Sequence, residues 1–244
     1  MVILIALAAS VATFVGGILA IRFKDKLHLV LGFSAGAVIG VALFDLIPES
    51  IDLGSKYFDL STITSITGAG FLIYLVLDRL VFLHVHGHED EGAGHDGAHL
   101  HRGVLGAGSL AIHSFLDGVA IGLAFQVSPV IGAVVAIAVL VHDFSDGINT
   151  VGLILKNKGE GRSALKWLIV DALAPLAGVA STLLFRLPES SLSLVLAIFA
   201  GFFLYIGASD LVPESHHAHP KFLTTVMTLL GAAVLYIAIH FAQI

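Results

Sequence analysis

Cysteine is absent from this chain of 244 residues. Its absence excludes disulfides and thiolate metal sites, so any metal site must be built from nitrogen and oxygen ligands. Charged residues are also scarce: they make up 12% of the chain, against 57% hydrophobic residues, and a soluble domain carries about 25%. The basic residues are spread between apolar stretches and form no single patch, so the net charge of −6 gives no sign of a nucleic-acid partner and we expect none. We therefore predict an integral membrane protein with almost no soluble part.

Apolar stretches long enough to cross a lipid bilayer of about 30 Å occur eight times in the chain. The first stretch is followed by Arg22, Lys24 and Lys26, whereas a secretory signal carries its positive charges before the apolar run. We therefore expect the first stretch to be retained as a membrane span. The predicted spans are residues 2–21, 27–48, 62–83, 103–126, 129–155, 164–186, 191–212 and 222–242.

The basic residues predict how these spans are oriented. An even number of spans puts both termini on the same side of the membrane. If the termini lie outside, the inner loops hold ten of the twelve basic residues and the outer loops hold only Lys56 and Arg186. The positive-inside rule thus predicts a multi-pass protein with both termini extracellular or periplasmic.

Residues 84–101 form the long inner loop of this arrangement and are rich in His, Gly and acidic residues. Because they show no apolar periodicity, we expect a disordered cytoplasmic loop within a single transmembrane domain of residues 1–244. Its six imidazoles, three of them at His84, His86 and His88, favour weak capture of metal ions. A merely solvated linker is the alternative.

Two copies of one short sequence end the second and seventh spans. Asp45–Ser50 reads Asp-Leu-Ile-Pro-Glu-Ser, and Asp210–Ser215 reads Asp-Leu-Val-Pro-Glu-Ser. The second span runs outward and the seventh runs inward, so the copies lie at opposite faces of the membrane. Inverted repeats of this kind are typical of transporters. The sequence thus predicts an all-α protein in a 3+2+3 arrangement, in which helices 1–3 and 6–8 are inverted copies.

A second pair of motifs occupies the fourth and fifth spans, at His113–Gly118 and His142–Gly147. Each motif places a His and an Asp four residues apart, on one face of a helix. The short turn at residues 126–129 predicts an antiparallel hairpin, and His113 and His142 each lie 13 residues from that turn. At 1.5 Å per residue, both histidines lie roughly 20 Å below the outer surface.

His113, Asp117, His142 and Asp146 are therefore expected to converge on one point near mid-membrane. A charged side chain at that depth costs roughly 2.5–3.5 kcal/mol, and a bound cation would offset this cost. Two imidazoles and two carboxylates suit Zn²⁺, Fe²⁺, Mn²⁺, Co²⁺ or Cd²⁺ better than Mg²⁺ or Ca²⁺. A proton relay is the alternative, because buried Asp and His also serve pumps.

Other polar residues are assigned to the surroundings of this site. Ser114 and Asp143 would line an adjacent position, and Asp45 and Asp171 would complete the site or form a gate. A further group is predicted to act as accessory metal ligands or gate residues: Asp210, Glu214, Glu49, His216, His217, His84, His86 and His88.

In these motifs the chain resembles the ZIP family of divalent-metal transporters. The fourth-span motif of that family, His-Asn/Ser-x-x-Glu/Asp-Gly, is matched at His113–Gly118. Its fifth-span motif, His/Gln-Asp/Glu-x-Pro-Glu/His, is matched at His142, Asp143 and Asp146, with Ser145 where the family usually has Pro. The eight spans, the outside termini and the His-rich inner loop also fit, so the resemblance covers essentially the whole chain.

This resemblance implies uptake of divalent transition-metal ions, zinc above all, through a prokaryotic plasma (inner) membrane. It also implies that spans 1, 4, 5 and 6 carry the ion as one bundle and that Asp117 and Asp146 bridge two adjacent ions. A homodimer without enzymatic activity is expected on the same grounds. Asp45 stands where several members of the family have His or Met. This makes the site more acidic and would favour harder ions such as Mn²⁺ or Fe²⁺.

Two other classes of function stay open at this point. An intramembrane zinc hydrolase would hold its metal tightly with one position open for water, but the chain contains no His-Glu-x-x-His motif. A proton- or sodium-coupled carrier of organic solutes would not need paired His-x-x-x-Asp motifs at one depth. Uptake of metal ions by the purified protein separates both classes from a metal transporter.

Overall fold

The computed structural model is helical throughout, and no strand occurs among the residues that it describes. Eight of its helical segments are long and apolar enough to cross a membrane, which confirms the prediction of an all-α protein with eight spans. The described residues are 1–22, 27–86, 95–157, 159–216 and 222–242. The helical elements are α1 (Val2–Arg22), α2 (Leu27–Val41), η1 (Ala42–Leu46), α3 (Ile47–Gly54), α4 (Leu60–His86), α5 (His95–Val127), α6 (Pro129–Lys156), α7 (Gly161–Thr182), α8 (Glu189–Tyr205), η2 (Ile206–Leu211), α9 (Val212–His216) and α10 (Phe222–Ala242).

The second and seventh spans are longer than predicted, because each continues through a proline. Their predicted ends at residues 48 and 212 are wrong, and the spans run on to Gly54 and Ser215. Pro48 has no N–H to donate to the carbonyl four residues before it, and in a regular α-helix its ring would clash with that carbonyl. The π-helical turn η1 directly precedes α3, and Pro48 is the second residue of α3. In the same way, η2 directly precedes α9, and Pro213 is the second residue of α9. The wider turns accommodate the prolines, so the helices do not end there.

The long inner loop is shorter than the predicted 84–101. Helix α4 continues to His86 and helix α5 begins at His95, so helix replaces the predicted loop at both of its ends. Once a helix is nucleated, each added residue gains one hydrogen bond, which favours extension beyond the apolar run. Residues 87–94 lie outside the described part of the chain.

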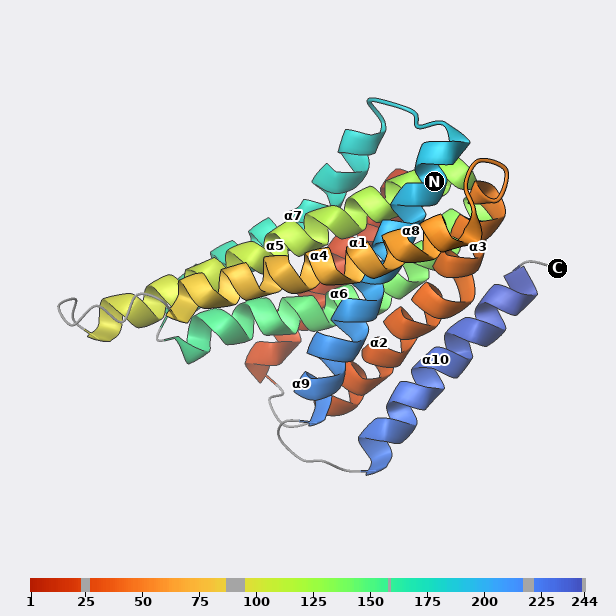
Figure 1. Ribbon diagram of the computed structural model, residues 1–244. Helices are drawn as coiled ribbons and strands as arrows, with labels where there is room; N and C mark the ends of the chain where they lie inside the picture. The colour runs from red at the N-terminus through yellow and green to blue at the C-terminus, as the bar shows by residue number, and fades with distance from the viewer. Residues whose placement is uncertain (23–26, 87–94, 158, 217–221, 243–244) are drawn as a thin grey trace.

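The helices pack as two groups. The motif bundle comprises α1, α5, α6 and α7, and the repeat bundle comprises α2, η1, α3, α4, α8, η2, α9 and α10. The most extensive helix pairings lie within one bundle: α1 with α6, α5 with α7, α2 with α10, and α4 with α8. Figure 1 shows α10 at the edge of the molecule beside α2, with the start of α1 and the end of α10 toward the end of the molecule where α3 lies.

Glycines let the helices within each bundle approach to backbone contact. A β-carbon on Gly36 of α2 would overlap the backbone carbonyl of Thr228 in α10, and one on Gly201 of α8 would overlap the carbonyl of Thr67 in α4. In the motif bundle, Gly147 of α6 lies against the backbone of α1 in the same way. Small residues at such positions are a common means of helix association in membranes. Each bundle is therefore tightly packed within itself.

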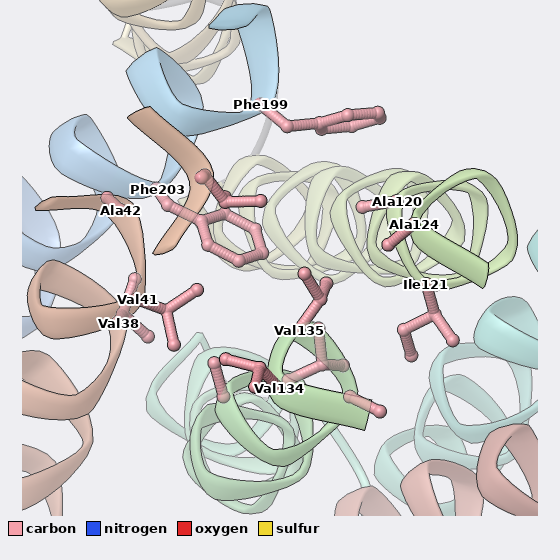
Figure 2. Close-up of a cluster of buried hydrophobic side chains, with 14 of the residues drawn as sticks. Val38, Val41, Ala42, Ala120, Ile121, Ala124, Val134, Val135, Phe199 and Phe203 are labelled. Carbon is pink, nitrogen blue, oxygen red and sulfur yellow. The ribbon is translucent and has the colours of Figure 1, made fainter. Parts of the chain in front are cut away.

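The two bundles meet at an apolar interface (Figure 2). Its buried side chains are Val38, Val41, Phe199 and Phe203 from the repeat bundle and Ala120, Ile121, Ala124, Val134 and Val135 from the motif bundle. These side chains carry no hydrogen-bonding group, so this part of the contact depends on close packing and not on directional bonds. Hydrogen bonds also cross between the bundles: Ser34 of α2 donates to the backbone carbonyl of Val141 at 2.9 Å and accepts from Ser145 at 3.2 Å.

Replacing Gly36 by alanine is expected to destabilise the protein, because the new methyl group must push α2 away from α10. Overpacking of this kind costs about 1–3 kcal/mol. Gly68 is a matched control, since a β-carbon there would meet nothing within 4 Å. The measurement is the thermal unfolding midpoint of each variant in detergent. Equal midpoints for Gly36→Ala and Gly68→Ala would show that the α2–α10 contact is not close.

Candidate metal centre

A tight turn between α5 and α6 brings the two His-x-x-x-Asp motifs together. Only Ser128 separates the helices, and its hydroxyl accepts the backbone N–H of Ile131 at 3.1 Å. Pro129 follows at the first helical position, where a backbone N–H would have no partner within the helix, so the proline removes no hydrogen bond. The two helices therefore run antiparallel as predicted and pack against each other.

His113, Asp117, His142 and Asp146 form one buried cluster, in which four ligand atoms lie within 4.8 Å of one another. Asp117 Oδ2 lies 3.2 Å from Nε2 of both histidines. Asp146 Oδ2 lies 3.4 Å from His113 Nε2 and 3.9 Å from His142 Nε2. None of the four residues is more than 6% exposed. The structure thus places two imidazole nitrogens and two carboxylates around one point.

Both histidines direct Nε2 into the cluster because Nδ1 is engaged elsewhere. Nδ1 of His142 lies 2.9 Å from the backbone carbonyl of Ala138, and because a carbonyl oxygen can only accept, Nδ1 carries the proton. In the neutral ring, Nε2 then has a free lone pair. Nδ1 of His113 lies 2.9 Å from the hydroxyl of Tyr74. Metal-binding histidines are typically held in this manner through their second nitrogen.

A second group of buried polar side chains adjoins this cluster. Asp171 of α7 accepts a hydrogen bond from Ser114 at 2.6 Å and another from Thr150 at 2.7 Å. Asp143 is completely buried, and neither of its carboxylate oxygens has a hydrogen-bond partner among the described residues. This excess of buried acid is what a bound cation would compensate.

The other predicted site residues lie outside the four-residue cluster. Asp45 lies in η1 of the repeat bundle; it is buried, and its Oδ2 has no hydrogen-bond partner among the described residues. Asp210 and Glu49 are half-buried, and Glu214 is exposed. The remaining accessory candidates lie outside the residues whose side chains are described: His84, His86, His88, His216 and His217.

Two contacts of the site were not anticipated from the sequence. Tyr74 of α4 reaches His113, and Thr150 of α6 reaches Asp171. A signal for each is present in the sequence. Tyr74 lies within a span, away from the membrane surfaces where tyrosine is usually enriched, and Thr150 lies four residues after Asp146, on the same helix face.

The comparisons with known proteins agree with this geometry. Residues 88–238, more than half of the chain, match the family model described as the ZIP zinc transporter. The chain is 28% identical over 252 residues to the zinc transporter ZupT of Corynebacterium glutamicum, covering 96% of this chain and 95% of that protein. It is 29% identical over 258 residues to the zinc transporter ZIP9-A of Xenopus laevis, covering 86% and 84%. The chain therefore belongs to the ZIP zinc transporter family.

Proposed function

We propose that this protein takes up divalent transition-metal ions across the plasma membrane and binds each ion through His113, Asp117, His142 and Asp146. The observation that carries the proposal is the convergence of their four ligand atoms within 4.8 Å, buried between two membrane spans. Buried ionisable groups at such a depth mark ion pathways. Membership of a transporter family removes the support for an intramembrane hydrolase.

Zinc is the first candidate among the transported ions. A site of two imidazoles and two carboxylates matches the number and type of ligands that Zn²⁺ takes in proteins. Fe²⁺, Mn²⁺, Co²⁺ and Cd²⁺ accept the same donors, whereas Mg²⁺ and Ca²⁺ prefer shells of oxygen alone. The relatives named zinc transporters support zinc as the substrate.

Asp143, Asp171 and Ser114 supply a second position for an ion beside the first. The unpartnered oxygens of Asp143 support this assignment, and the hydroxyls of Ser114 and Thr150 hold the carboxylate of Asp171 in place. Asp117 and Asp146 would then lie between the two ions. Asp45 is assigned to the path by which ions reach the site. The accessory acids and histidines are assigned to the two ends of that path: Asp210, Glu214, Glu49, His216, His217, His84, His86 and His88.

Transport requires that the site open to each side of the membrane in turn. The two bundles support such a motion, with the motif bundle carrying the ion against the repeat bundle. Matched features in the two halves support an inverted repeat of helices 1–3 and 6–8. Asp45 and Asp210 both lie in π-helical turns, and Gly36 and Gly201 both make backbone contact with a neighbouring helix. An inverted repeat gives two arrangements that face opposite sides.

The distribution of charge along the chain supports one orientation in the membrane. The distribution of basic residues supports termini on the outer side and a His-rich segment, residues 84–101, on the cytoplasmic side, where it would capture metal weakly. In Figure 1 the start of α1 and the end of α10 lie toward one end of the molecule, which supports this orientation. A homodimer completes the proposal.

Metal flux into proteoliposomes tests the proposed function. Zn²⁺, Mn²⁺, Fe²⁺, Cd²⁺ and Mg²⁺ are compared, with the Asp117→Ala/Asp146→Ala double variant as the control. We expect saturable uptake of the transition metals, loss of that uptake in the double variant, and little uptake of Mg²⁺. Tight stoichiometric zinc in the purified protein with no flux would overturn the proposal.

A further inference from the structure

The two histidines of the metal centre are held in different ways. His142 is held by Ala138, one turn earlier in its own helix, so this contact moves with α6. His113 is held by Tyr74, which belongs to α4 of the other bundle. One metal ligand is therefore oriented within the motif bundle, and the other is oriented from across the interface between the bundles.

Tyr74 is fixed in the repeat bundle by its ring. The ring packs edge-on against Phe202 at a centroid distance of 5.3 Å, and it lies 5.3 Å from the ring of Tyr205, both at the end of α8. It also meets the imidazole of His113 nearly at right angles, at 5.9 Å. Because α4 and α8 form one of the closest helix pairs, Tyr74 follows α8 and not α5 when the bundles move.

We propose that Tyr74 is a positioning residue that makes the metal affinity of the site depend on the arrangement of the two bundles. The proposal rests on the proposed transport function. In the arrangement described here, the Tyr74 hydroxyl fixes the His113 ring so that Nε2 faces Asp117 and Asp146. A shift of the motif bundle separates Tyr74 from His113, the imidazole gains rotational freedom, and the site weakens. The ion is thereby held in one arrangement and released more readily in the other.

The coupling must act in both directions. If the Tyr74 contact strengthens metal binding, then a bound metal strengthens the contact and stabilises this arrangement by the same factor. The metal would thus favour the state in which it is held, without any direct bond between the metal and the repeat bundle. The hydrogen bond of His142 provides no such coupling, since its second nitrogen is bonded within α6, and the contact of its ring with the repeat bundle is the packing against Phe203 at 5.8 Å.

Substitution of Tyr74 by phenylalanine tests the inference, because it removes the hydroxyl and keeps the packed ring. We expect the affinity of the purified protein for Zn²⁺ to fall about tenfold, the lower end of the range for loss of a residue that supports a metal-binding histidine. The visible absorption spectrum of bound Co²⁺ should change, because it reports the geometry of the ligands. In proteoliposomes, KM should rise by the same factor while the maximal rate is maintained.

Two further variants make the result specific. Tyr57→Phe is the matched control, because the Tyr57 hydroxyl bonds an exposed carboxylate of Glu189 at 3.3 Å, far along the chain from the site; it should leave affinity and spectrum unchanged. In a His113→Ala background, Tyr74→Phe should cause no additional loss of Zn²⁺ affinity, since the two residues act through one contact.

The outcomes separate this inference from the transport function. If wild-type protein moves zinc and Tyr74→Phe keeps the wild-type affinity and Co²⁺ spectrum, the positioning role is wrong and the transport function stands. A loss of maximal rate with unchanged KM would likewise contradict the positioning role. Absence of zinc flux in the wild type would overturn the transport function itself, whatever the variant binds.

Discussion

Replacement of Asp117 by alanine is expected to reduce zinc uptake more than about 100-fold. Oδ2 of Asp117 is the atom that lies 3.2 Å from Nε2 of both histidines, so its removal takes away the oxygen shared by both imidazoles. Loss of a residue that only supports a ligand already costs about 10–100-fold in metal affinity or activity, and loss of the ligand itself should exceed that range. The initial rate of zinc entry into proteoliposomes measures the effect.

The control for this experiment is Asp52→Ala, which removes an exposed carboxylate in α3. It should leave the rate of zinc entry within about twofold of the wild type, since surface substitutions have small effects. Asp117→Asn gives a second check, because it keeps the shape of the side chain and removes its charge. Normal zinc uptake by both Asp117 variants would rule out the four-residue cluster as the transport site.

The cluster itself was predictable because it depends on local rules. The spacing of each motif puts His and Asp on one helix face, and a short turn forces the two helices to run antiparallel, so equal distances from the turn bring His113 and His142 to one depth. The long apolar runs gave the eight spans in the same way. These features need no knowledge of how distant segments pack.

The features that were missed depend on contacts between distant segments. Tyr74 and His113 are 39 residues apart and lie in different bundles, and no helical periodicity relates them. The continuation of the second span through Pro48 was missed because proline normally disrupts a helix interior, and the π-helical turn that precedes it has no simple sequence signal. Asp45, predicted to complete the site or form a gate, lies outside the four-residue cluster, and its role stays a prediction.

Asp143 and Asp171 are expected to respond oppositely to the same substitution. Asp143 is completely buried without a hydrogen-bond partner among the described residues, so ionising its carboxyl in the metal-free protein carries a desolvation cost. Asp143→Asn removes the ionisable group and, at a pH at which the carboxyl is ionised, should stabilise the metal-free protein by about 1–2 kcal/mol. For a chain of this size the gain corresponds to a rise of roughly 2–8 °C in the thermal midpoint.

Asp171→Asn is the matched comparison, because Asp171 is equally buried but accepts hydrogen bonds from Ser114 and Thr150. Bonds to a charged acceptor are stronger than bonds to a neutral amide, so this variant should lower the midpoint. Both midpoints are measured in detergent with a chelator present, so that only the metal-free protein is compared.

Zinc uptake by Asp143→Asn should nevertheless fall at least about tenfold. Residues at functional sites commonly lower the stability of a protein because the activity needs them. We expect Asp143 to be such a residue. If Asp143 contributes to an ion position, the wild-type protein should also gain more thermal stability from added zinc than the variant does, because a ligand stabilises the state that it binds.

A variant that is both more stable and fully active would show that Asp143 takes no part in transport. A variant destabilised as much as Asp171→Asn would show that the Asp143 carboxylate is satisfied in the folded protein, and the charge argument for a second ion position would then fail.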